Sequence, residues 1–189
     1  MNYDEIIRNV LNENRYKHTL GVVKVATELA DRFGADKEKA TIAAYLHDYA
    51  KPLNYNEALK VIEKYDIILD EETLENPELL HAPVGMAIAK YELGINDEEI
   101  LEAIRYHTTG KENMSLLTKI IYLADLIEPS REFDGVEKIR KIAYKDLDLA
   151  LKISFDNTII YLIKKNMIIH SDTIKSRNYI IRNLTRGKK

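Results

Sequence analysis

The spacing of apolar residues along the chain is helical. In the segment that ends at Phe33, apolar residues recur in steps of three and one: Val22, Val25, Ala26, Leu29, Ala30 and Phe33. Steps of this kind place side chains on one face of a helix. No segment alternates cleanly between apolar and polar residues with the period of two that marks a strand. The pattern therefore predicts an all-α fold.

Helix-capping signals predict eight to ten separate helices. Gly34 stands where a C-terminal glycine ends a helix. Asp36 can cap the next helix, which we expect to run to about Tyr49 because Pro52 prevents its continuation. Capping-box spacing recurs at three further places: Asn54 with Glu57, Asn96 with Glu99, and Asp134 with Glu137. The stretch 67–80 gives the weakest signal.

The amino-acid composition excludes several kinds of site and several classes of protein. The chain has 189 residues, few glycines and prolines, no linker of low complexity and no internal repeat, which favours a single domain. It has no cysteine, so disulfides, cysteine nucleophiles, thiolate zinc sites and Fe–S clusters are excluded. No apolar run reaches the length of a membrane span. The first ten residues lack the apolar region of a secretory signal, so we expect a cytoplasmic protein.

The charge balance disfavours nucleic acid as a partner. Lys and Arg number 28, Asp and Glu number 31, and the formal net charge is −3, whereas proteins that coat nucleic acid are usually basic. The tail 173–189 is an exception, with six basic residues and no acidic one. It could contact RNA or guide a polyanion. A terminal helix with a solvated basic face explains it equally simply, and we favour that interpretation.

Histidine is rare, and its positions suggest a metal site. The five histidines are His18, His47, His81, His107 and His170. The His47–Asp48 pair falls near the end of a predicted helix of small apolar residues, and Asp125 lies inside the apolar run IIYLADLIEP. Buried charges need partners, and a metal ion is one, although a structural ion pair at a helix end fits His47–Asp48 alone equally well. Imidazoles and carboxylates are ligand types for one or two divalent cations.

The order His18, His47-Asp48, Asp125 resembles the H…HD…D motif of the HD-domain phosphohydrolases, a helical superfamily. Five longer strings resemble the YqeK family within it: RYKHTLGV, LHDYAKP, HAPVGMAIA, AIRYHTTG and MSLLTKIIYLADLIEPSREFDGVEKIR. Members of that family hydrolyse diadenosine tetraphosphate symmetrically. The resemblance implies one HD domain over residues 1–189, with a core over about 15–151 and C-terminal helices in 146–189 packed on it.

The resemblance also implies a dinuclear centre. One metal is expected on His18, His47, Asp48 and Asp125, and the second on His81 and His107, with Asp48 bridging. His170 has no counterpart in the family pattern. The family favours iron, and the mixed imidazole and carboxylate set suits Fe or Mn better than Mg. Such a centre lowers the pKa of a bound water toward about 7, so hydroxide attack on the phosphoanhydride is the simplest expected mechanism.

Further residues are expected to act with the metals because they lie near the ligands in sequence. Asp48, Lys51 and Arg131 are the candidate catalytic residues, and the last two could also grip phosphate. Gly21, Thr108 and Thr109 are further candidate substrate contacts. Lys51 and Arg131 could instead pair with surface acids.

The expected substrate is a dinucleoside polyphosphate, or a nucleoside diphosphate. One competing hypothesis is another HD-domain nucleotide phosphohydrolase or phosphodiesterase. A second is a non-enzymatic nucleotide-binding or RNA-binding HD protein, which the basic tail supports. Nothing in the sequence marks a dimer face, so the oligomeric state stays open.

Overall fold

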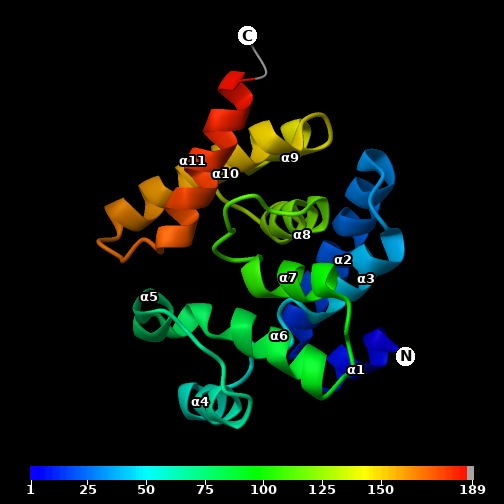
Figure 1. Cartoon of the computed structure of the whole chain (residues 1–189). Helices are drawn as coiled ribbons and strands as arrows, with labels where there is room; N and C mark the ends of the chain where they lie inside the picture. Colours follow the sequence, from blue (N-terminus) through cyan, green and yellow to red (C-terminus); the bar gives the residue numbers. More distant parts are fainter. Residues whose placement is uncertain (187–189) are drawn as a thin grey trace.

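The computed structural model describes residues 1–186, which contain helices and no strand (Figure 1). The helices are α1 (Tyr3–Arg8), α2 (Glu13–Phe33), α3 (Lys37–Leu46), α4 (Tyr55–Lys64), α5 (Glu71–Glu75), the 3₁₀ helix η1 (Pro77–Leu79), α6 (His81–Tyr91), α7 (Glu98–Tyr106), α8 (Leu116–Ile127), α9 (Val136–Ala143), α10 (Leu147–Lys164) and α11 (Ser171–Arg186). The all-α prediction is confirmed. The last three residues of the basic tail lie outside the described residues.

The predicted number of helices was too low. The described chain has eleven α-helices, where the sequence predicted eight to ten. Helix α1 has six residues and α5 has five, and α5 lies in the stretch 67–80. A helix of one or two turns is too short to display the apolar periodicity from which longer helices are recognised. Short helices of this kind are held by their caps and by packing against neighbours.

The capping signals located most helix ends within a residue or two. Asn54 and Glu57 form the predicted capping box, and Asp36 caps α3. Helix α7 is capped by Asp97 in place of Asn96, and Gly135 precedes α9 in place of a capping Asp134. Asp97 has an extended backbone and caps α7 with its side chain, whereas Gly135 has a left-handed backbone and offers no side-chain cap.

Helix α8 lies in the middle of the molecule. Figure 1 shows it nearly end-on, with α2 and α3 on one side and α10 and α11 on the other. It packs against α2, α3, α7, α9 and α10. Eight of its twelve residues are buried, as expected for a helix that is apolar nearly all round. Because α8 is fixed on several sides, its one acidic residue, Asp125, is held in a defined place.

The last helices pack on this central part. Helix α10 contacts α8 and α9, and α11 contacts α10. The division into a core over 15–151 and a packed C-terminal part stays a prediction. Within residues 1–186 no helix is long and apolar enough to cross a membrane. The cytoplasmic location also stays a prediction.

Replacing Leu123 by alanine should lower the free energy of unfolding by about 2–5 kcal/mol, because Leu123 is fully buried on α8 and its loss leaves a cavity. Urea denaturation would measure the change. The matched control is Ile68→Ala, since Ile68 is 90% exposed and its truncation should change stability by less than about 0.5 kcal/mol. Equal effects of the two substitutions would contradict the central place of α8.

Candidate metal centre

The six predicted ligands converge on one buried site. His18 lies on α2, and His47 and Asp48 directly follow α3. His81 is the first residue of α6, His107 directly follows α7, and Asp125 lies on α8. Five helices therefore deliver the cluster. Because each side chain stands at a helix end or on a tightly packed helix, the fold fixes its position.

Asp48 lies at the middle of the cluster, and its two oxygens face different histidines. Oδ1 lies 3.2 Å from His81 Nε2 and 3.8 Å from His107 Nε2. Oδ2 lies 3.8 Å from His47 Nε2 and 4.0 Å from His18 Nε2. A carboxylate with one oxygen on each side has the arrangement of a bridge between two cations.

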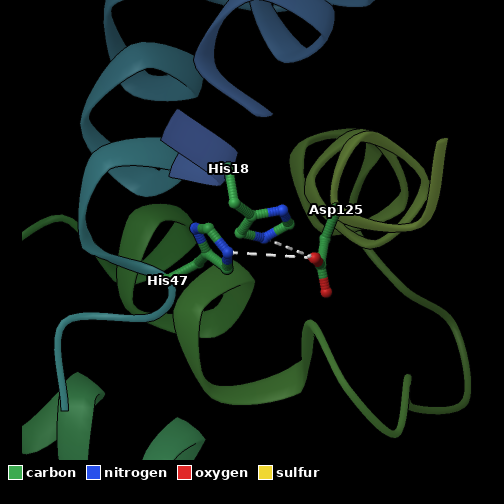
Figure 2. Close-up of side chains that lie close together, drawn as sticks. All are labelled: His18, His47 and Asp125. Atoms are coloured by element: carbon green, nitrogen blue, oxygen red, sulfur yellow. Dashed lines mark ion pairs between the residues drawn. The ribbon is translucent and has the colours of Figure 1, made fainter. Parts of the chain in front are cut away.

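Asp125 completes the side of the cluster that contains His18 and His47. Its Oδ1 lies 3.0 Å from His18 Nε2 and 3.9 Å from His47 Nε2. Figure 2 shows the two imidazoles and this carboxylate pointing toward one another from three separate parts of the chain. The cluster thus divides into a first group (His18, His47, Asp125 and Asp48 Oδ2) and a second group (His81, His107 and Asp48 Oδ1).

Three of the histidines are oriented by the same local hydrogen bond. Each ring lies with Nδ1 close to the carbonyl oxygen three residues earlier: His47 to Ala44 at 2.7 Å, His81 to Glu78 at 2.7 Å, and His107 to Ile104 at 2.8 Å. A carbonyl oxygen only accepts, so Nδ1 must carry the hydrogen. In a neutral ring the Nε2 lone pair then faces the cluster, as in metal-ligating histidines.

The histidine nitrogen atoms that face into the cluster are suited to bind cations. His81 Nε2 and His107 Nε2 lie 3.0 Å apart, so two lone pairs face each other when both Nδ1 atoms donate outward. His18 Nε2 and His47 Nε2 are buried and have no hydrogen-bond partner within residues 1–186. His18 Nε2 is close to Asp125 Oδ1, but without the geometry of a hydrogen bond. Buried polar atoms without partners are costly, and bound cations would satisfy all four.

Burial and charge give His47, His81 and the two carboxylates the protonation states that ligation requires. At His18, in contrast, burial is outweighed by the nearby Asp125 carboxylate, which raises the pKa of the ring. Burial lowers the pKa of His47 to about 4 and also lowers the pKa of His81, so both rings are neutral near pH 7. Burial alone would raise the pKa of the Asp48 and Asp125 carboxyls. The imidazoles around them outweigh that effect and hold both pKa values below the usual range. Neutral imidazoles and ionised carboxylates are the forms that bind a metal.

Glu128 contacts the ring nitrogen of His18 that faces away from the cluster, and the sequence analysis did not identify it. It is 1% exposed, and its Oε1 lies 3.0 Å from His18 Nδ1. Ser130 donates to the same carboxylate from its backbone N–H at 2.8 Å and from its hydroxyl at 2.5 Å. A carboxylate behind a histidine fixes the orientation of the ring and raises its basicity as a ligand. The only sequence signal was an acidic residue directly after the apolar run of α8.

Gly21 is packed against Glu128. A Cβ atom at this position would lie 2.6 Å from Glu128 Oε2. The missing side chain therefore makes room for the carboxylate that orients His18. The predicted contact of Gly21 with substrate stays a prediction.

Two arginines border the first group of ligands. Arg131 donates from Nη2 to Asp125 Oδ1 at 2.5 Å and from Nε to the Asp125 carbonyl at 2.9 Å. Arg15, which the sequence analysis missed, donates from Nη1 to Asp48 Oδ2 at 2.8 Å. Its signal was its position one helical turn before His18. Both arginines line a cleft of about 590 Å³ beside His18.

Lys51 borders the second group of ligands, on the other side. Its Nζ donates to Glu78 Oε2 at 2.8 Å. Lys51 and His81 line a cleft of about 200 Å³ together with Leu53 and Tyr55. The cluster is therefore accompanied by two clefts, one beside His18 and one beside His81. Each cleft has at least one cationic side chain next to a ligand.

The two threonines after His107 have other surroundings. Thr109 is buried, its hydroxyl donates to the Gly110 carbonyl, and its own carbonyl accepts from the Thr173 hydroxyl. Thr108 lines a small separate cavity with His170, of about 10 Å³, enough for about one water molecule. The predicted substrate contacts of Thr108 and Thr109 stay predictions.

His170 is held within the structure and lies apart from the cluster. Its Nδ1 accepts from the Asp172 N–H at 3.1 Å. Its Nε2 lies 3.1 Å from Asp70 Oδ1 and 3.0 Å from the Thr73 hydroxyl. Both ring nitrogens thus have protein partners.

Comparison with known proteins gives consistent results. The sequence model of the HD domain matches residues 15–130. A Bacillus subtilis protein named "Bis(5'-nucleosyl)-tetraphosphatase, symmetrical" is 48% identical, over 93% of this chain and 94% of its own. A Staphylococcus aureus protein of the same name is 38% identical, over 92% and 90%. The crystal structure of a predicted HD superfamily hydrolase involved in NAD metabolism from Clostridium acetobutylicum superposes with a TM-score of 0.92, at 47% identity over 96% of both chains.

Replacing Glu128 by alanine should weaken metal binding at the first group of ligands by about 10–100-fold, because His18 loses the carboxylate that orients it. Competition with a chelator would measure the affinity, and circular dichroism would verify the fold. Glu132→Ala is the matched control, since Glu132 is exposed and lines the same cleft. Unchanged affinity in Glu128→Ala would refute the supporting role.

Proposed function

This chain belongs to the HD-domain family, and we propose that it is a metal-dependent hydrolase that cleaves diadenosine tetraphosphate symmetrically into two ADP. The observation that carries the proposal is the bridging position of Asp48, with one oxygen toward His81 and the other toward His18. Relatives that match over more than nine-tenths of this chain and carry the name of that activity support the choice of substrate.

The two groups of ligands would each hold one divalent cation. The first group offers two imidazoles and two carboxylate oxygens, and the second offers two imidazoles and the other oxygen of Asp48. When bound, two such cations lower the pKa of a water molecule and neutralise charge on the phosphate oxygens. We propose iron as the metal, with manganese as the alternative, because imidazole and carboxylate ligands together suit both.

The cationic side chains are placed to bind a tetraphosphate on both sides of its centre. Arg15 and Arg131 each use part of the guanidinium to hold a ligand carboxylate, and their side chains remain 38% and 41% exposed. The N–H groups not used in this way can donate to phosphate oxygens. Lys51 can do so from the cleft beside His81. Central cleavage requires phosphates on both sides of the cations, and each cleft contains at least one cationic side chain.

Metal-loaded protein incubated with diadenosine tetraphosphate should give ADP as the sole product, detected by chromatography. Asp48→Ala should abolish both metal occupancy and turnover, because it removes the shared ligand. Asp31→Ala is the matched control, since Asp31 is an exposed residue paired with Lys37. AMP with ATP, or free phosphate, as the products would contradict the proposal and favour a different HD-domain nucleotide hydrolase.

Replacing Lys51 by alanine should raise KM for diadenosine tetraphosphate about tenfold, because one charge-assisted hydrogen bond to phosphate is lost. Arg131→Ala should lower kcat as well, since Arg131 also holds the ligand Asp125. Steady-state kinetics would separate the two effects, with Lys60→Ala as the exposed control. Unchanged kinetics in both variants would remove Lys51 and Arg131 from the substrate site.

A further inference from the structure

A hollow lined by residues of α8, α10 and the segment after α8 shares two lining residues with the cleft beside the metal centre. Arg131 and Phe133 line the cleft that contains His18. The same two residues line a second hollow of about 360 Å³, whose other wall includes Asn157 and Tyr161 on α10. Arg131 and Phe133 therefore border both spaces. A nucleotide whose phosphates bind Arg131 would have the second hollow beside it.

The second hollow has the chemistry of a nucleoside site. Phe133 is 37% exposed and Tyr161 is 55% exposed, so both aromatic rings offer surface for stacking. Aromatic rings of this kind bind nucleobases through their faces. Arg131, at the junction, has a guanidinium next to the position where a phosphate would enter. The lining thus combines a stacking surface with a cation at one end, which matches a nucleoside joined to phosphate.

Asn157 adds a group that can distinguish one base from another. It lies four residues before Tyr161, so both occupy the same face of α10. Its side-chain amide makes no hydrogen bond to other residues in the range 1–186 that the structure describes, although it lines the hollow. An amide offers a donor and an acceptor side by side, the pattern that the N6 and N7 atoms of adenine complement.

We propose that this hollow binds one nucleoside of the substrate, with the base against Phe133 and Tyr161 and its edge at the Asn157 amide. The inference rests on the proposed function for the identity of the ligand. Apart from Leu126, the residues that line the hollow lie after residue 130, where the match to the HD domain ends. The proposed metal ligands thus lie within the HD segment, and the two aromatic residues and Asn157 lie in the segment that follows it.

Calorimetric titration of the metal-loaded full chain with ADP and with pyrophosphate tests the inference. Tyr161→Ala should raise the Kd for ADP about tenfold, equal to about 1.4 kcal/mol, and leave the Kd for pyrophosphate unchanged. Phe133→Ala should act in the same direction, whereas Tyr161→Phe should bind ADP as the native protein does. The matched control is Tyr91→Ala, a 56% exposed tyrosine at the end of α6.

Three results would overturn the inference. The first is ADP binding that is unchanged in both Tyr161→Ala and Phe133→Ala. The second is an equal loss of ADP and pyrophosphate binding, which would indicate damage to the metal centre. The third is a changed sedimentation coefficient with unchanged ADP binding, which would show that the hollow is a contact between subunits. Failure of the proposed function would be seen separately, as absence of ADP production by the native protein.

The part assigned to Asn157 is tested by base preference. Asn157→Ala should reduce the ratio of ADP affinity to UDP affinity at least threefold, because the group that reads the adenine edge is removed. The affinity for pyrophosphate should stay as in the native protein. An unchanged ratio would overturn the assignment of Asn157.

Discussion

The structure depends on an electrostatic constraint at its centre, where imidazole lone pairs and ionised carboxylates are crowded into a largely buried space. His81 and His107 face each other through Nε2 at 3.0 Å, and the Nε2 atoms of His18 and His47 have no hydrogen-bond partner within the described part of the chain. Only positive charge at the cluster satisfies these atoms together. Because five helices contribute to the cluster, bound cations and the packing of the helices would stabilise each other.

Hydrogen bonds at the Nδ1 atoms of the histidines fix the orientation of each ring in the cluster. At His47, His81 and His107 a backbone carbonyl one turn earlier fixes the ring, so a helix end both supplies the ligand and selects its tautomer. His18 lies within a helix whose carbonyls are already used, and a separate carboxylate, Glu128, takes this role. This difference explains why Gly21 has no side chain: the carboxylate must come close to α2 to reach the ring.

The structure brings together the six residues that the family resemblance indicated as ligands. Rare histidines at helix ends and one acid in an apolar run suggested a metal site, but these local features alone did not define the ligand set. Glu128 and Arg15 were missed because their roles depend on helices meeting in space. Thr108 was chosen for its position next to His107, and in the structure it lines a small cavity with His170. The short helices α1 and α5 were missed because they contain too few turns to show a period.

The two-sided form of the centre provides a physical reason for symmetrical cleavage. Asp48 joins the two groups of ligands, so substrate atoms at the cations lie between the cleft of Arg131 and the cleft of Lys51. A tetraphosphate with equal halves would place its central bond at the cations only if both halves were bound. If only one half were bound, the phosphate chain could shift along the site and present a different bond to the cations. Repulsion between anionic phosphates makes an ungripped half costly. In the proposed enzyme, the site of cleavage would therefore be selected by the groups in the two clefts, which hold the phosphates on either side of the shared carboxylate.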